Sequence, residues 1–88
     1  MPTLSLFYGI IITMYQEVGG KHHLPHFHAS YQDYNVAISF DGDILEGSLP
    51  ISKLKLVHAW AEIHKESLEA NWKLLQQGNK VFKIDPLR

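Results

Sequence analysis

The stretch HFHASYQDYNVAISFDGD (residues 26–43) contains two strand patterns and two turns. Apolar and polar side chains alternate in HFHASY (26–31) and NVAISF (35–40), which is typical of half-buried β-strands. Residues 32–34 separate these two segments, and the following turn, DGD (41–43), contains an Asp-Gly pair, a strong hairpin signal. The stretch therefore predicts antiparallel strands joined by tight turns.

The segments on either side extend this pattern. Residues 10–15 alternate after Gly9 and predict a strand, and ILEGSL (44–49) predicts another that Pro50 stops. The connection between the first two strands, residues 16–25, holds two glycines and ends in a proline. We therefore predict a meander of four antiparallel strands.

After Pro50 the spacing between apolar residues changes from every second residue to every third or fourth residue. This spacing predicts an amphipathic helix over residues 53–77, with Ser52 as its N-cap and Gly78 as its stop. Such a helix measures about 37 Å at 1.5 Å per residue, whereas the sheet is only about 19 Å across. It must either kink near His64–Ser67 or extend beyond the sheet. The residues of its main apolar stripe are Leu54, Val57, Ala61, His64, Leu68, Trp72 and Leu75.

The predicted fold class is α+β: a four-stranded antiparallel β-meander followed by one long C-terminal helix, kinked or straight, packed on one face. Residues 81–84 (VFKI) could add a short edge strand. The 88 residues form one predicted domain, residues 1–88, and 45% are hydrophobic, as in globular proteins. Cysteine is absent, which excludes disulfides and thiolate metal sites.

The apolar start, MPTLSLFYGIIITMY, lacks the basic region and cleavage site of a signal peptide and is too short for a membrane span. We therefore expect a cytoplasmic protein without a membrane partner. Charge is uneven along the chain: residues 1–51 carry one lysine and five carboxylates, and residues 52–88 carry seven basic groups and four carboxylates. The basic second half is either a solvated helix surface or a face for RNA or an acidic partner.

Four of the six histidines lie within residues 22–28. On a strand, His26 and His28 point to the same side, which we expect to be the open face because Phe27 and Ala29 suit the helix side. Tyr15 could fall on this open face, as could Thr13, Ser30, Ser39 and Asp41. Imidazoles, hydroxyls and a phenol together are the components of an acid–base site.

Three interpretations of these histidines remain open. His26 and His28 could bind a divalent metal, with His22 or His23 as a further ligand, although an HxH pair alone is a weak signal. They could instead cleave RNA without a metal, as two histidines or as a histidine with Tyr15. The third interpretation is purely structural, with imidazoles that hydrogen-bond locally. No cofactor is predicted, and whether the protein is an enzyme is left open.

The segments MPTLSLFYGI, IITMY, PHFHASY, LEGSLP and WAEIHKESLEANW resemble a family of small bacterial proteins known only as a domain of unknown function, number four-one-six-zero in its series. The resemblance covers residues 1–76, and the PHFHA box is its most specific element. His26 and His28 correspond to family positions, whereas the loop with His22 and His23 differs from the family's shorter, proline-rich stretch.

The resemblance implies a gene neighbourhood like that of a toxin–antitoxin pair, because such proteins are often encoded beside another small protein. The predicted function is therefore the toxin-like component of a two-gene operon, acting on RNA through His26 and His28, with Tyr15 as a further catalytic candidate. Two alternatives stand beside it. One is a non-catalytic module that binds the product of the neighbouring gene, and the other is a weak histidine metal-binding protein.

The helix also predicts a homodimer. Apolar residues stand beside its main stripe, so the apolar arc is wider than one sheet covers: Leu56, Trp60, Ile63 and Leu74. An exposed patch of this kind is usually buried against a second copy. A break near Glu66–Ser67 that folds the second half back on the sheet would bury it internally instead.

Overall fold

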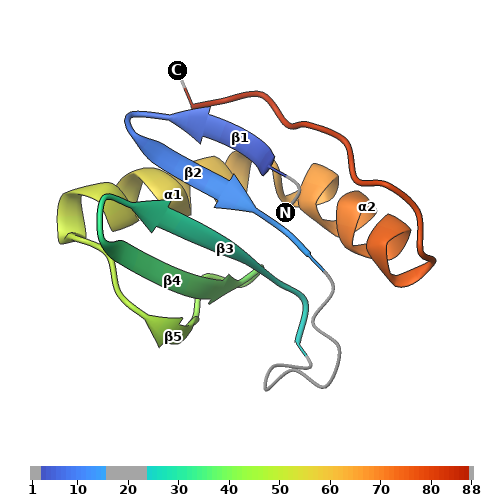
Figure 1. Ribbon diagram of the computed structural model, residues 1–88, viewed down its shortest axis with the longest axis horizontal. Coiled ribbons are helices and arrows are strands. Elements are labelled where there is room, and N and C mark those ends of the chain that lie inside the picture. The colour runs from blue at the N-terminus through green and yellow to red at the C-terminus, as the bar shows by residue number, and fades with distance from the viewer. Residues whose placement is uncertain (1–2, 16–23, 88) are drawn as a thin grey trace.

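The computed structural model describes residues 3–15 and 24–87, and it shows one antiparallel sheet with two helices packed against one face (Figure 1). The α+β class is thus confirmed, but the described sheet has five strands instead of four, and two helices stand where one was predicted. The strands follow each other in chain order across the sheet. They are β1 (Thr3–Phe7), β2 (Ile10–Thr13), β3 (His26–Tyr31), β4 (Tyr34–Ser39) and β5 (Ile44–Gly47), and the helices are α1 (Ile51–Ile63) and α2 (Lys65–Gln76).

Strand β1 is the element that the sequence pattern missed. It pairs with β2 through a two-residue turn, in which Tyr8 and Gly9 have positive φ values of 50° and 78°. Positive φ at both turn residues is typical of two-residue hairpin turns, because their twist then matches the twist of the two strands. Its pairing is irregular between Thr3 and Ser5, so its side chains do not alternate regularly. Leu4 and Phe7 of this strand are buried in the core.

The predicted long helix is interrupted at His64, within the range 64–67 considered for a kink, and two separate helices replace it. Helices of 13 and 12 residues measure about 20 and 18 Å, and each is shorter than the width of about 24 Å for five strands. The helix begins at Ile51, one residue before the predicted cap: Pro50 takes the N-cap position, and its carbonyl accepts the N–H groups of Lys53 and Leu54. The predicted stop at Gly78 is confirmed, since Gly78 has a φ of 77° directly after α2 and its cap.

The core lies between the sheet and the helices, and the residues predicted for the helix side fill it. Ile10, Ile12, Met14, Phe27, Ala29, Val36 and Ile38 are all buried. Trp60 of α1 is fully buried among them, with its ring centroid 5.6 Å from Phe7 and 5.8 Å from Phe27. Trp60 is therefore core and cannot belong to an exposed patch on α1. Neither a continuous helix nor an exposed Trp60 is therefore present to favour a dimer, and the homodimer stays a prediction.

The segment after α2 returns along the β1 edge of the sheet (Figure 1). Residues 81–84 do not form the edge strand considered from the sequence, and a backbone hydrogen bond from Ile84 N–H to the Leu4 carbonyl, 2.8 Å, joins them to β1. The side chain of buried Asn71 holds the segment instead, because it donates to the Phe82 carbonyl at 2.9 Å and accepts the Phe82 N–H at 2.8 Å. Trp60 Nε1 donates to the Asp85 carbonyl at 2.8 Å.

Candidate functional site

The open face of the sheet carries side chains in rows that cross the strands. One row runs from Thr13 through His28 and Ala37 to Glu46, since these residues are direct partners across β2, β3, β4 and β5. The next row holds Ile11, Ser30 and Asn35. Because side chains two apart on a strand share a face, both rows project from the side opposite the helices.

His28 and Tyr15 form the centre of the candidate site. Tyr15 follows β2, and its ring stacks on that of His28 with centroids 4.7 Å apart and planes 16° from parallel. Both side chains are half-buried, so each keeps part of its surface accessible. The structure thus brings together an imidazole and a phenol that the sequence had placed on the open face as candidates.

His26 lies behind His28, contrary to the expectation that it is exposed on the open face. It is only 2% exposed, and its ring contacts His28 edge-on at 5.2 Å and Trp72 at 5.5 Å between centroids. His26 is the first residue of β3, and the contact with Trp72 of α2 shows that this helix reaches the end of the sheet there. Its Nδ1 lies 2.7 Å from the Leu24 carbonyl, which can only accept, so Nδ1 carries a proton.

A hollow of about 340 Å³ opens beside His28 and Tyr15. Its lining groups are hydroxyls, an amide, the imidazole and the phenol, and none of the lining residues that the structure describes is Lys, Arg, Asp or Glu. Imidazole is the side-chain group that most often serves in general acid–base catalysis. The lining residues are Thr3, Ile11, Thr13, Tyr15, His28, Ala29, Ser30 and Asn35. We call this the histidine hollow.

The other candidates separate from the histidine hollow. Ser39 and Asp41 line a second hollow at the end of β4. His58 lies away from the histidine hollow, and its Nε2 donates to the Gly42 carbonyl at 3.0 Å. His22 and His23 lie outside the described residues.

Sequence reasoning missed two polar lining residues of the histidine hollow, Thr3 and Asn35. Asn35 could have been found, because the register of the β3–β4 hairpin places it opposite Ser30. Thr3 could not, because it requires strand β1.

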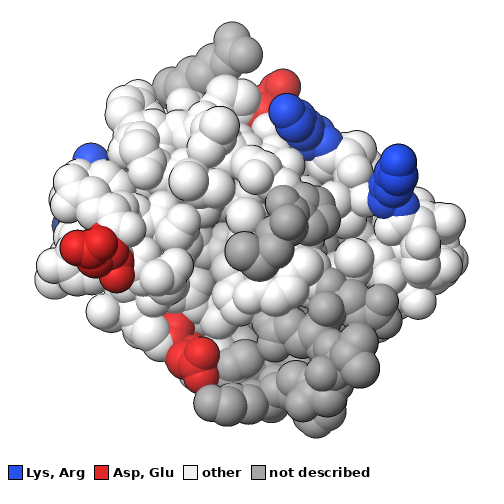
Figure 2. Space-filling view, in the orientation of Figure 1, with Lys and Arg blue, Asp and Glu red and all other residues white. Residues whose placement is uncertain are grey.

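Within residues 3–15 and 24–87, no three His, Cys, Asp or Glu side chains are grouped so that they could hold a metal ion. The weak divalent-metal site expected from the HxH pair stays a prediction. Among the same residues, no helix has the length and apolar character needed to cross a lipid bilayer. Figure 2 shows the sheet side of the molecule, where the visible charged side chains lie near the edge of the face and not at its centre.

Comparisons with curated proteins and with solved structures found no match for this chain. A family model described as a domain of unknown function, DUF4160, matches residues 9–73. The matched range extends from the β1–β2 turn into α2 and includes Tyr15, His26 and His28. The match covers most of the chain, and the protein therefore belongs to the DUF4160 family.

Proposed function

We propose that this protein cleaves RNA without a metal ion, as the toxin-like member of a two-gene pair, and that the histidine hollow is its active site. The observation that carries the proposal is the contact chain Tyr15–His28–His26, which presents an imidazole and a phenol beside a hollow lined by hydroxyls and an amide. The family resemblance supports the pairing with a neighbouring gene. An RNA substrate would be met in the cytoplasm.

His28 and Tyr15 divide the proton transfers between them. His28 removes the proton of a ribose 2′-hydroxyl, and the 2′-oxygen then forms a bond to the adjacent phosphorus while the bond from phosphorus to the 5′-oxygen breaks. Tyr15 donates its proton to the departing 5′-oxygen and regains one through solvent from His28. The products are a 2′,3′-cyclic phosphate and a 5′-hydroxyl, and no oxidant, metal or co-substrate is consumed.

His26 has a different role in this proposal from the one that its sequence position suggested. Because it is buried, it does not reach a substrate, and it acts as a positioning residue whose edge supports the His28 ring. The Leu24 carbonyl fixes its orientation through Nδ1. Replacing His26 should therefore lower the cleavage rate less than replacing His28 does, and His26→Phe should restore part of the rate lost in His26→Ala.

The test is incubation of the purified protein with end-labelled single-stranded RNA in EDTA. We expect fragments that end in a 2′,3′-cyclic phosphate, and no cleavage of the same sequence as DNA, which lacks the 2′-hydroxyl. His28→Ala should reduce the rate by about 100-fold or more, the usual contribution of a general acid or base. His58→Ala, the same change on a histidine away from the hollow, should keep the wild-type rate.

Intact RNA at every enzyme concentration, or equal rates for the wild type and His28→Ala, would refute this proposal. Expression in a bacterial host gives a second readout: the wild type should slow growth, and His28→Ala should not. Equal growth of the two strains would remove the toxin part of the proposal.

A non-catalytic module that binds the product of the neighbouring gene is the second candidate, and one observation favours it. Leu6 and Ile11 are partners across β1 and β2 on the open face, and they are 62% and 40% exposed. Apolar side chains of this size on an uncovered sheet face suit a protein partner. Leu6→Asp should then weaken binding of the neighbouring gene's product. The cleavage rate of His28→Ala tests the enzyme proposal separately.

A further inference from the structure

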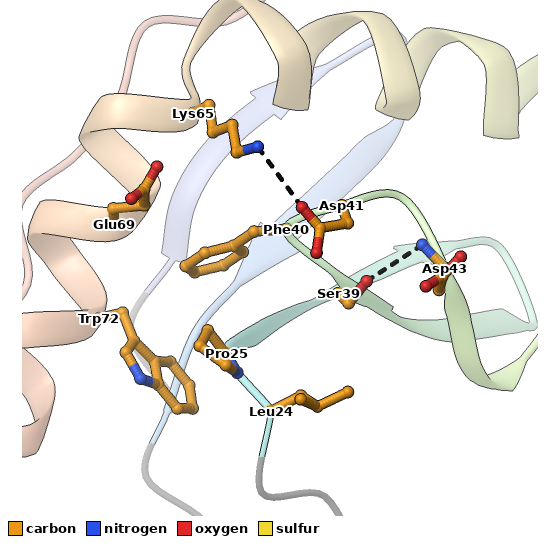
Figure 3. Close-up of a pocket in the computed structure, with 9 residues that line it drawn as sticks. All are labelled: Leu24, Pro25, Ser39, Phe40, Asp41, Asp43, Lys65, Glu69 and Trp72. Atoms are coloured by element: carbon orange, nitrogen blue, oxygen red, sulfur yellow. Dashed lines mark hydrogen bonds and ion pairs between the residues drawn. The ribbon is translucent and has the colours of Figure 1, made fainter.

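A groove that the histidine hollow does not include lies where the end of the sheet meets α2 (Figure 3). Its volume is about 480 Å³. The groove receives residues from the entry to β3, from the β4–β5 turn and from α2, so it exists only once the helix is packed on the sheet. Its lining residues are Leu24, Pro25, Ser39, Phe40, Asp41, Asp43, Lys65, Glu69 and Trp72. We call it the acidic groove.

The wall of the acidic groove is apolar and aromatic. Phe40 and Trp72 meet edge to face with centroids 6.1 Å apart, and both rings are half-buried, so part of each borders the groove. Leu24 and Pro25 continue the apolar wall, and Leu24 is exposed. Aromatic faces attract cations and also pack against apolar side chains.

The rim of the acidic groove carries excess negative charge. Three carboxylates, Asp41, Asp43 and Glu69, line it together with one ammonium group, Lys65. Lys65 forms an ion pair with Asp41 (Figure 3), with 3.5 Å between Nζ and Oδ1, so this positive charge is already paired. Asp43 and Glu69 have no ion pair among the described residues.

The turn that bears two of these carboxylates is held in place by hydrogen bonds. Ser39 Oγ accepts the Asp43 N–H at 3.1 Å, and the Ser39 N–H donates to the Asp43 carbonyl at 2.8 Å. The Gly42 N–H donates to the Ser39 carbonyl at 2.9 Å. A ligand that binds here would therefore meet a turn that needs little further ordering, which lowers the entropic cost of binding.

We propose that the acidic groove docks a basic segment of a partner protein, with an arginine or lysine side chain lying across Trp72 and Phe40 and its charged end among the carboxylates. Charge complementarity identifies the occupant, because the unpaired Asp43 and Glu69 favour a cation and the aromatic wall favours one with an apolar stem. A peptide fits better than a small amine, since Leu24 and Pro25 offer an apolar surface to the residue beside the basic one. The proposal does not depend on RNA cleavage.

The experiment is an NMR titration of the full chain with the peptide acetyl-Ala-Leu-Arg-Leu-Arg-Ala-amide. The indole N–H signal of Trp72 and the backbone amide of Asp43 should shift together, and the affinity should fall as salt is added. The peptide in which glutamine replaces arginine should bind more weakly. Spermidine, an amine without apolar side chains, should also bind more weakly than the arginine peptide.

Two substitutions of opposite sign make the test sharp. Asp43→Asn should weaken binding of the arginine peptide by two- to fivefold, the range for an exposed ion pair, whereas Lys65→Gln should tighten it because Asp41 is then free. Asp33→Asn is the matched control: it is an exposed aspartate on the β3–β4 turn, about 20 Å away along β3, and it should leave the affinity unchanged.

Three results would overturn the proposal. They are the absence of any shift at millimolar peptide, equal binding of the arginine and glutamine peptides, and spermidine binding as tight as that of the arginine peptide. The last would make the groove a site for small organic cations. None of these results alters the cleavage assay with His28→Ala, so the two proposals fail separately.

Discussion

Replacing Asn71 should release the C-terminal segment from the helices. The Asn71 side chain is fully buried and forms two hydrogen bonds to the backbone of Phe82, as donor at 2.9 Å and as acceptor at 2.8 Å. In Asn71→Ala both backbone groups lose their partners. A buried polar group without a partner costs about 1–3 kcal/mol, but Phe82 is exposed, so water can compensate part of this loss.

The magnitude follows from these two opposing effects. Two lost hydrogen bonds should destabilise the protein by about 2–3 kcal/mol, and the higher helix propensity of alanine offsets about 0.5 kcal/mol. In a domain of this size 1 kcal/mol corresponds to about 4–8 °C in Tm, so the net loss of about 1.5–2.5 kcal/mol should lower Tm by about 6–20 °C. Thermal unfolding followed by circular dichroism measures this change.

A second readout separates release of the segment from general loss of stability. Lys80 and Lys83 lie in the segment, and trypsin should cut after them faster in Asn71→Ala than in the wild type at a temperature where both are folded. Gln76→Ala, an exposed change on the same helix, should change Tm by less than about 3 °C and leave this cleavage unchanged. A Tm for Asn71→Ala within 2 °C of the wild type, or unaltered trypsin cleavage, would refute the reasoning.

Three further outcomes can be measured on the purified protein. Ser5 is buried and its Oγ has no partner among the described residues, so Ser5→Ala should raise Tm by a few degrees; a lower Tm would mean that the hydroxyl is bound. Millimolar Zn²⁺ should raise Tm only slightly, and a rise above 5 °C that disappears in His28→Ala would support the metal-binding alternative. Light scattering should give the mass of two chains of 10.1 kDa, and Ile63→Lys, at an exposed apolar position of α1, should reduce it to one; one chain in the wild type would refute the homodimer.

The parts of the fold that could be predicted are those that a periodic pattern encodes locally. Alternation of apolar and polar residues, together with the turn residues, predicts strands β2 to β5. Apolar residues spaced by three and four predict the helical segments on both sides of the break. Strand β1 was missed because its irregular pairing between Thr3 and Ser5 removes the alternation. The helix break could be expected only from a comparison of lengths, since no glycine or proline marks His64.

The candidate site divides in the same way. Alternation along β3 was enough to place His28 on the open face beside Tyr15. The contact of buried His26 with Trp72 joins residues 46 positions apart and forms only through the packing of α2. The acidic groove has the same origin, because Lys65 and Asp41 meet across 24 positions of sequence. Contacts of this kind have no local signal.

His26 connects the two surfaces to which we assign functions. On one side its ring supports His28, and on the other it contacts Trp72, while its Nδ1 donates to the carbonyl of Leu24. Trp72 and Leu24 are also walls of the acidic groove. A segment docked in the acidic groove, as proposed, would therefore lie against Trp72, which contacts the His26 ring, and Leu24, whose carbonyl accepts from His26 Nδ1. If both proposals hold, the buried His26 contacts the proposed docking groove through Trp72 and the proposed acid–base site through His28.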